Sequence, residues 1–558
     1  MRGENGELEK SKRVRVEVVD RFGSDEKLDS MARVENEVER ADKVEVRESV
    51  IRWVCEAEIA QKEFDEGEKG DWEVKWDDVK GGELDGELVA KARAEEIGYM
   101  KRRGIWRVVP LKECWERTGK APVGVRWVDT NKGSEGTPEI RSRLVARDFR
   151  CKADKDREDL FVATPPIEAE RLALSRAATW IRRRDGTRGL RKLMFIDAKK
   201  AHLNPRCQEE VYIELPNEAG EGEGMCGRLE YWIYGCKRAA QAWEEYYAGK
   251  LEGAGFVRGI GCGVVFYHEE RDVTVGCHGD DFTCVGEGRD LDWLAKEMAG
   301  WFEIKVRAVL GSGVNDDKEA VILGRIVRWR DEGIEFEADP RHRRLLADHF
   351  GFTDESAEGA VNGDRERREF EGEEEEEMGP RESIMFQGLA ARLNYLAQDS
   401  PDLQYAAKEV ARDMARPRVG AWRRLKRVVR YVLGRESVVW KFGWQEDGQG
   451  LTARSDSDWG GSREDRKSTS GGVLMLGTHC IKTWSSTQGA IALSSAEAEF
   501  YAMVDSVIKA KWVGTIAMEM GLGEVDKVLV LGTDSPAAKS FVSRRGLGRM
   551  RHIEVRDL

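Results

Sequence analysis

Apolar and polar residues follow two periodicities along the chain after Gly82, and these predict a mixture of helices and strands. ELVAKARAEEIGYMKRRG has the spacing of an amphipathic helix and leads into two short apolar segments, WRVVP and VGVRWVDT. These segments predict strands, NKGSEGTPE predicts a hairpin turn, and IRSRLVARDF predicts the returning strand. RLALSRAATWIRRR predicts another amphipathic helix, with Leu172, Leu174, Ala178 and Ile181 on one side.

Further apolar segments predict additional sheets. LMFID (193–197) and VYIELP (211–216) have the length of short buried strands, and VVFYHEERDVTVGCHGDDFTCVG predicts three strands joined by two turns. Helical spacing recurs in AAQAWEEYYAGKLEGAGF, in LDWLAKEMAGWF and between Ser383 and Gly434. From Leu451 onward, strands give way to a helix that starts near Ser495 and then to a strand, KVLVLGTDS. The chain is therefore expected to be a multidomain protein of α+β and α/β class.

The composition separates folded segments from unfolded ones. With 558 residues and a hydrophobic fraction of 40%, the chain is long enough for several hydrophobic cores. Residues 1–81 mix acidic and basic residues with few aromatics, which predicts a charged, partly disordered extension. Residues 351–382 are acidic, with the run Glu373–Glu377, and predict a linker or an insertion. Folded segments are expected over 82–350, 383–448 and 449–558.

Charge and cysteine content argue against several classes of protein. A formal net charge of −13 argues against a general nucleic-acid coat protein, although arginines gather at 141–157, 182–192 and 423–430. The ten cysteines lack C-x-x-C spacing, so reduced thiols are expected rather than a zinc site or disulfides. The N-terminus has no secretory signal, and no stretch approaches the roughly 18 apolar residues of a membrane span. An intracellular chain, cytoplasmic or nuclear, is expected, with no membrane partner.

Asp280 and Asp281 form an acidic pair between two apolar strand segments, VTVGC and FTCVG. Adjacent carboxylates in a tight hairpin repel each other unless a cation neutralises them. Phosphoryl transfer uses such a site, where two Mg²⁺ ions roughly 4 Å apart activate the attacking oxygen and stabilise the leaving one. Asp197, at the end of the apolar strand LMFI, is a third carboxylate of the right kind. Taken alone, the pair is more often a solvated turn, because 105 acidic residues produce such pairs by chance.

The order of the surrounding motifs resembles copia-type reverse transcriptases. VGVRWVDTNKG and IRSRLVARDF are similar to the first strands of that domain, and DLFVATPPIEAERLAL is similar to its Phe-Ala-Pro-Val segment. Three later blocks of the family, in the family's order, resemble FIDAKKAHLN with EEVYIELP, then YGCKRAAQAWEEYY, then SIMFQGLAARLNYLAQDSPDLQYAAKEVARDMARP. The five blocks imply a right-hand polymerase, with fingers at 82–192, a palm at 193–330, and thumb and connection helices up to residue 448.

The resemblance also implies a set of functional residues. Asp197, Asp280 and Asp281 would bind Mg²⁺ or Mn²⁺, while Arg141 and Arg143 would contact the phosphates of the incoming dNTP. Ordinary exposed strand residues are the alternative for the two arginines. The implied partners are an RNA template, a DNA primer and the RNA/DNA hybrid. AWRRLKRVVRYVLG would either cradle this heteroduplex or form a solvated amphipathic helix.

Four positions depart from the family pattern. His278 replaces the Tyr or Phe two positions before the acidic pair, and Gly279 replaces a valine. His202 stands where an aromatic ring excludes the ribose 2′-hydroxyl, and Arg238 stands where a glutamine touches the incoming nucleotide. His202 and Arg238 are therefore expected to bind the substrate with an altered rate and an altered sugar selectivity.

The C-terminal segment resembles the RNase H domain of the same family, through SDSDWGG, RKSTSG, LSSAEAE and HIEVRDL. Asp456, Glu499 and Asp534 would hold metal ions for phosphodiester hydrolysis. Glu497 is the less suitable glutamate for that role, and Asp458 is expected to be a structural turn residue. The family's fourth metal-binding Asp would follow some tens of residues later, so a C-terminally truncated domain is expected.

Two functions remain open on these grounds. The first is an RNA-directed DNA polymerase that uses two metal ions at the Asp197 set and carries an RNase H-like domain. The second is a decayed retroelement relic that at most binds nucleic acid. An RNA-templated RNA polymerase would share the Gly-Asp-Asp sequence but leaves the RNase H-like segment unexplained.

Overall fold

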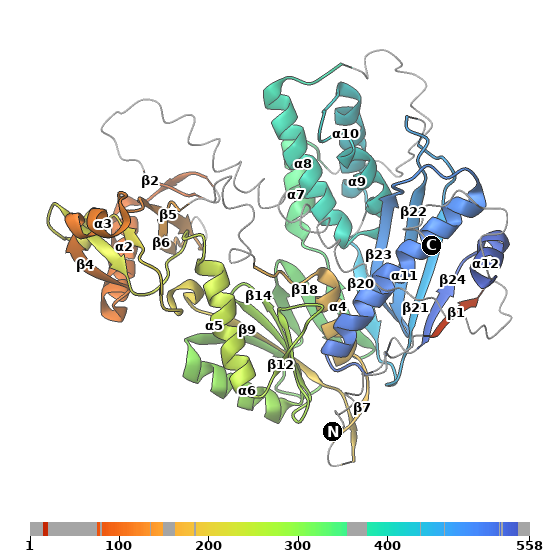
Figure 1. The fold of residues 1–558 in the computed structure, drawn as a ribbon, viewed down its shortest axis with the longest axis horizontal. Helices are drawn as coiled ribbons and strands as arrows, with labels where there is room; N and C mark the ends of the chain where they lie inside the picture. Colours follow the sequence, from red (N-terminus) through yellow and green to blue (C-terminus); the bar gives the residue numbers. More distant parts are fainter. Residues whose placement is uncertain are drawn as a thin grey trace, which may run out of the picture.

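The computed structural model describes most of the chain after residue 81 and two short segments before it. The described residues are 15–19, 75–78, 81–133, 136–148, 162–183, 186–353, 376–435, 437–462, 464–523, 525 and 528–544. Most of the predicted charged extension and of the predicted acidic linker lies outside these residues. Figure 1 shows the parts in chain order, from orange elements on one side to the blue C-terminal sheet on the other.

The N-terminal part packs a helix against a small sheet and a hairpin (Figure 1). Its elements are β2 (Lys75–Trp76), β3 (Glu83–Leu84), α2 (Gly86–Arg103), β4 (Trp106–Pro110), α3 (Leu111–Thr118), β5 (Val125–Asn131), β6 (Ile140–Ala146), β10 (Tyr212–Ile213) and β11 (Met225–Leu229). β5 and β6 pair antiparallel along their whole length, which confirms the predicted hairpin. α2 begins after Asp85, whose side chain accepts two amide hydrogen bonds, and ends at Gly104 with φ +66°.

A six-stranded antiparallel sheet, the central sheet, occupies the middle of the molecule in the order β12-β13-β14-β15-β9-β16. Its strands and two of its helices are β9 (Lys192–Ala198), β12 (Val257–Arg258), β13 (Val265–His268), β14 (Val273–His278), β15 (Asp281–Gly286), β16 (Ile304–Leu310), α5 (Ala239–Gly253) and α6 (Gly288–Trp301). Leu193 to Ile196 on β9 are all buried, and because successive side chains of a strand point to opposite faces, both faces of the sheet are covered at this strand. Burial on both faces explains why this strand is a continuous apolar run.

A second antiparallel sheet and a helical cluster follow. Of these, the sequence predicted the helices after residue 383 and not the sheet. The sheet has the order β17-β18-β19-β20, with β17 (Glu319–Ile322), β18 (Arg325–Arg330), β19 (Gly333–Glu337) and β20 (Val439–Gly443). The cluster contains α7 (Pro340–His349), α8 (Pro380–Gln398), α9 (Gln404–Ala411) and α10 (Val419–Leu433), which surround their own apolar core. Because β20 pairs with β19, the segments before and after the acidic stretch share one sheet.

The C-terminal sheet combines strands from both ends of the chain, in the order β1-β24-β21-β22-β23. Its elements are β1 (Arg15–Val19), β21 (Leu451–Ser457), β22 (Thr469–Leu476), β23 (His479–Thr487), β24 (Val528–Gly532), α11 (Ser495–Glu519) and α12 (Pro536–Ser543). β1 runs parallel to β24, with Arg15 opposite Val528 and Val19 opposite Gly532. A short piece of the predicted extension therefore forms an edge of this sheet.

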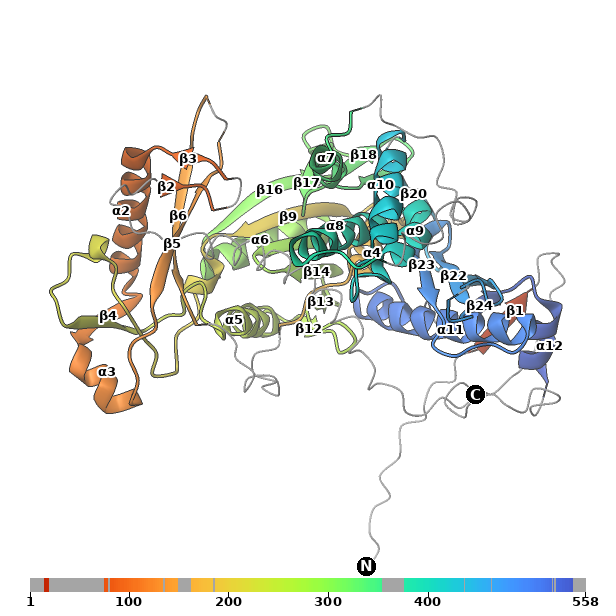
Figure 2. The same cartoon turned by 90° about the horizontal axis from the view of Figure 1, so that it is seen from above.

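Helix α4 (Ile167–Ala177) lies between the central sheet and the C-terminal sheet in both views (Figures 1 and 2). The amphipathic helix predicted over 171–184 is wrong beyond Ala177. Thr179 bridges to Gln445, and the Trp180 amide donates to the Gln445 carbonyl at 2.9 Å. These backbone contacts end the helix, and a short hairpin of β7 (Ile181–Arg182) and β8 (Arg188–Gly189) follows.

Buried ion pairs fix α4 to its neighbours. Arg171 donates to Asp399 at 3.1 Å, and Arg325 donates to the other oxygen of Asp399 at 2.8 Å, with all three side chains at most 5% exposed. Arg176 donates to Asp272 and to the Gly521 carbonyl. Breaking such a pair leaves an uncompensated buried charge, so these contacts lock the sheets and helices together. The central and C-terminal sheets accordingly share one continuous apolar core.

Two exclusions made from the sequence concern the described residues directly. The eight cysteines within the described ranges are all unpaired thiols, as the lack of paired spacing predicts. Among the helices in the described ranges, none combines the length and the apolar character that crossing a bilayer demands.

Candidate active sites

The first carboxylate set lies where two strands of the central sheet meet a hairpin. Asp197 on β9 and Asp281 on β15 are directly opposite each other across the two antiparallel strands. Gly279 and Asp280 form the turn between β14 and β15, and Gly279 has φ +64°, a conformation that favours glycine. Trp243 Nε1 donates to the Gly279 carbonyl at 2.8 Å, and the amide at the end of β9 donates to the Asp280 carbonyl at 2.8 Å. The acidic turn is therefore held from two directions.

Arg307 on β16 places a positive charge against this set. Its Nη2 lies 2.5 Å from Oδ1 of Asp197, and its Nη1 lies 3.1 Å from Oδ1 of Asp281. Burial raises the pKa of Asp281 to about 6; Arg307 opposes that rise, and Asp280 and Asp197 add to it. Asp280 is exposed and makes no ion pair with any described residue. The set thus carries three carboxylates, two of which share one guanidinium.

A cavity of about 510 Å³ lies between α2, β6 and the residues after β9. Arg141 and Arg143, the two arginines predicted to contact phosphates, both line it, together with Lys200 and Tyr234. The Arg143 guanidinium lies 5.1 Å from the centre of the Tyr234 ring. Lys200 pairs with Glu96, which also lines the cavity. The fold therefore collects basic and aromatic groups beside the strand that carries Asp197.

The other two predicted substrate-binding residues differ in their surroundings. His202 packs against Tyr234 in a tilted arrangement, with ring centres 5.0 Å apart, and so touches the wall of the cavity. Burial lowers the pKa of His202 to about 4, so its ring is neutral at neutral pH. Arg238 instead pairs with Glu209, with Nη1 and Oε1 2.6 Å apart, and it is not among the residues that line the cavity.

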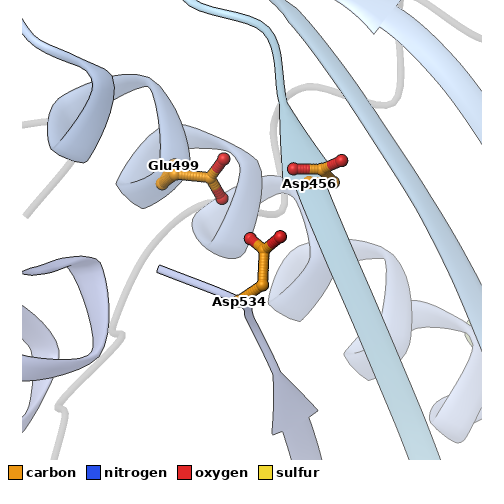
Figure 3. A group of neighbouring side chains, drawn as sticks. All are labelled: Asp456, Glu499 and Asp534. Carbon is orange, nitrogen blue, oxygen red and sulfur yellow. The ribbon is translucent and has the colours of Figure 1, made fainter. Parts of the chain in front are cut away.

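The second carboxylate set lies at the edge of the C-terminal sheet. Figure 3 shows Asp456 on β21, Glu499 on α11 and Asp534 just after β24 with their carboxylates turned toward one another. One ligand atom from each of the three lies within 4.8 Å of the other two, which is the spacing that a shared metal ion requires. Asp197, Asp280 and Asp281 do not form an equally compact group in the described part of the chain. The structure therefore gathers the second set more tightly than the first.

The electrostatics of the second set are those of crowded like charges. Burial raises the pKa of Glu499 to about 7; hydrogen bonds from the amide and hydroxyl of Ser457 oppose the rise, and Asp456 and Asp534 add to it. One oxygen of Glu499, Oε2, is buried and has no hydrogen-bond partner among the described residues. A cation bound between the three carboxylates would offset their mutual repulsion and give Oε2 of Glu499 a partner.

The two alternative acids near this set have structural contacts instead. Glu497 accepts hydrogen bonds from the Leu493 amide at 2.9 Å and from the Tyr501 hydroxyl at 3.0 Å. Asp458 accepts a hydrogen bond from the Thr469 amide at 2.5 Å. Neither belongs to the compact group.

Sequence reasoning missed Arg307 and Lys200. Lys200 follows Asp197 by three residues, so its nearness to the first set was a signal that the sequence offered. Arg307 has no such signal, because it stands 110 residues after Asp197 and reaches it only through strand pairing.

Comparison with known proteins agrees with the predicted family. Residues 104–322 match the family described as reverse transcriptase (RNA-dependent DNA polymerase). The chain is 24% identical over 489 residues, 84% of its length, to the retrovirus-related Pol polyprotein from transposon TNT 1-94 of Nicotiana tabacum. It is 26% identical over 480 residues (83%) to that from transposon RE2 of Arabidopsis thaliana, and 25% identical over 458 residues (78%) to that from transposon RE1.

These matches cover 34%, 30% and 28% of the three relatives, so the chain spans about a third of their length. They extend well beyond residues 104–322. The chain therefore carries a reverse transcriptase domain that includes residues 104–322, and its similarity to the three Pol polyproteins supports a copia-type retrotransposon polymerase polyprotein.

Proposed function

We propose that this chain is an RNA-directed DNA polymerase with a second, RNase H-like centre. The observation that carries the polymerase is the pairing of Asp197 with Asp281 across β9 and β15, beside Asp280, within the residues that match the reverse transcriptase family. The proposal includes a right-hand arrangement, with fingers over 82–192, a palm on the central sheet, and thumb and connection helices up to residue 448. An RNA template, a DNA primer and dNTPs are the proposed substrates.

The residues of the first set fit a divalent cation. Asp197 and Asp281 already share one cationic group, the Arg307 guanidinium, and Asp280 presents a third carboxylate at the hairpin. Hard oxygen ligands of this kind suit Mg²⁺ or Mn²⁺. Such ions, when bound, activate the attacking hydroxyl and stabilise the leaving oxygen of an in-line displacement. The three aspartates would hold them, and the hydrogen-bonded hairpin would keep the carboxylates in place.

The neighbouring cavity supports the binding of the incoming nucleotide. Arg141 and Arg143 supply charged donors for phosphate oxygens, and guanidinium groups can bond such oxygens in pairs. Tyr234 and the neutral His202, whose rings pack at a tilt, form an aromatic wall on the same side. In this proposal the arginines position the triphosphate, and His202 packs near the sugar.

The compact second set supports phosphodiester hydrolysis in the RNA strand of an RNA/DNA hybrid. Asp456 on a strand, Glu499 on a helix and Asp534 just after a strand converge on one point (Figure 3). Two-metal hydrolysis requires such a convergence of carboxylates. The raised pKa of Glu499 and its unpartnered oxygen are what three acids without their cation would display.

Metal-dependent primer extension tests the polymerase proposal. The full chain is incubated with poly(rA)/oligo(dT) and dTTP in Mg²⁺, in EDTA, and in EDTA followed by excess Mg²⁺. We expect extension in the first and third conditions only, because the three aspartates need a cation to act on the primer.

A decayed relic that only binds nucleic acid is the second candidate. The observation that favours it is Arg307, which occupies the space between two of the three carboxylates. Binding of the hybrid with no extension in either Mg²⁺ or Mn²⁺ would support the relic and contradict the polymerase.

Replacing His202 with phenylalanine is expected to raise the preference for dNTP over rNTP by about tenfold. The reason is that the larger six-membered ring closes the space near the 2′-position more completely than the imidazole. Single-nucleotide incorporation rates with dTTP and UTP measure this ratio. His349→Phe, in the helical cluster, is the matched control and should leave the ratio unchanged. An unchanged ratio in His202→Phe would show that His202 does not screen the sugar.

A further inference from the structure

Arg307 lies on β16 at an irregularity in the pairing of this strand with β9. Val306 is opposite Ile196 and Ala308 is opposite Phe195, so Arg307 is an extra residue without a partner of its own in the pairing. Such bulges turn a side chain away from the regular alternation of a strand. Here the bulge directs the guanidinium over β9 to the carboxylates of Asp197 and Asp281.

The contact neutralises a repulsion that the sheet itself creates. Asp197 and Asp281 face each other directly across antiparallel strands, and like charges in that position destabilise the pair. Both aspartate side chains are 22% exposed and Arg307 is 39% exposed, so all three are only partly screened by water. In the protein without metal, the Arg307 guanidinium therefore neutralises the repulsion between the two carboxylates, as a bound cation would.

A divalent ion and Arg307 cannot both use the same carboxylate oxygens. Arg307 donates to Oδ1 of Asp197 and to Oδ1 of Asp281. A cation held by these oxygens would have to displace the guanidinium, since two positive centres at one oxygen repel each other. The flexible arginine side chain on an edge strand is free to move outward when this happens.

We propose that Arg307 is a built-in counterion that holds Asp197 and Asp281 in register and competes with divalent metal for them. This inference rests on the proposed function, because it assigns the metal site to the same aspartates. Because of this competition, Arg307 raises the concentration of divalent metal that is needed to occupy the site at Asp197 and Asp281.

Direct Mn²⁺ binding tests the proposal without any polymerase assay. The full chain carries Glu499→Gln and Asp534→Asn, so that the second set does not contribute, and free Mn²⁺ is followed by electron paramagnetic resonance. Arg307→Gln is expected to bind Mn²⁺ about tenfold more tightly than this parent, because the competing charge is gone. Arg307→Lys keeps the charge but concentrates it on one nitrogen that cannot bridge both carboxylates as a guanidinium does, and it should bind Mn²⁺ with intermediate affinity.

Lys441→Gln is the matched control. It removes the same charge from β20 of the second sheet, where Lys441 is exposed and makes no ion pair within the described ranges, so Mn²⁺ affinity should stay within about twofold. Unchanged or weaker binding in Arg307→Gln, with a thermal melt like that of the parent, would overturn the proposal. If Mn²⁺ binds as expected but no variant extends primers, the polymerase function fails and the counterion role stands.

Discussion

Asp280→Asn is expected to slow primer extension on poly(rA)/oligo(dT) by about 10³-fold or more in Mg²⁺. Asparagine keeps the size of the side chain and removes the charge that would hold the cation. Asp280 is exposed and has no ion pair in the described structure, so its replacement should change the free energy of unfolding by less than about 0.5 kcal/mol. Initial rates of dTTP incorporation and a thermal melt measure the two effects separately.

Asp534→Asn is the matched control for this result. It makes the same change in the second carboxylate set, so primer extension should stay within about twofold of the unmodified chain. Near-normal extension by Asp280→Asn would remove the first set from the reaction. Loss of extension in Asp534→Asn would contradict the assignment of two separate centres.

Glu499→Gln is expected to reduce cleavage of the RNA strand of an RNA/DNA hybrid by about 10³-fold and to leave primer extension intact. Glu499 is the buried member of the compact set, and the amide cannot carry the negative charge that a shared cation needs. A labelled hybrid substrate measures the cleavage rate. Glu497→Gln lies two residues earlier on the same helix and retains cleavage, because that carboxylate is occupied by Leu493 and Tyr501. If Glu499→Gln and Glu497→Gln lost cleavage equally, the effect would come from a disturbance of helix α11 as a whole.

Glu499→Gln is also expected to change how the stability of the chain depends on pH when metal is absent. The pKa of Glu499 rises from 4.5 to about 7 on folding, so the folded chain binds an extra proton between these two values. The contribution of this group to stability is therefore full below pH 4.5 and is lost as the pH rises to about 7. In EDTA at pH 8, Glu499→Gln should melt at a higher temperature than the unmodified chain, and the difference should shrink toward pH 4.5. Mg²⁺ at pH 8 should raise the melting temperature of the unmodified chain more than that of the variant.

Local pattern predicted most of the regular elements correctly. The β5–β6 hairpin, the strand β9 and the helix α11 each have a strong apolar period and clear turn residues, so neighbouring residues alone specify them. The helix predicted over 171–184 extends past the observed end of α4 because the residues after Ala177 also have helical spacing. Contacts from Gln445, more than 260 residues away, compete with that pattern and turn the backbone away at Thr179.

The edge strand β1 illustrates the opposite case. Residues 15–19, RVEVV, are rich in valine, which favours strands, but they lie in a segment whose composition predicts a loosely attached, partly disordered extension, and a single short strand is not stable without a partner. Its partner is β24, more than 500 residues later in the chain. Only an exposed sheet edge, available after the C-terminal sheet has folded, makes that pairing favourable.

By itself, the sequence determined the resemblance to copia-type reverse transcriptases, the identities of the six candidate carboxylates and most of the strands and helices that carry them. Those features depend on residue type and on short-range spacing, which any chain displays before it folds. The tertiary structure decided how the carboxylates are held. It gathered Asp456, Glu499 and Asp534 around one point, and it placed Arg307 between Asp197 and Asp281. Strand register and a single bulge make these contacts, and both are set by packing between distant segments rather than by local sequence.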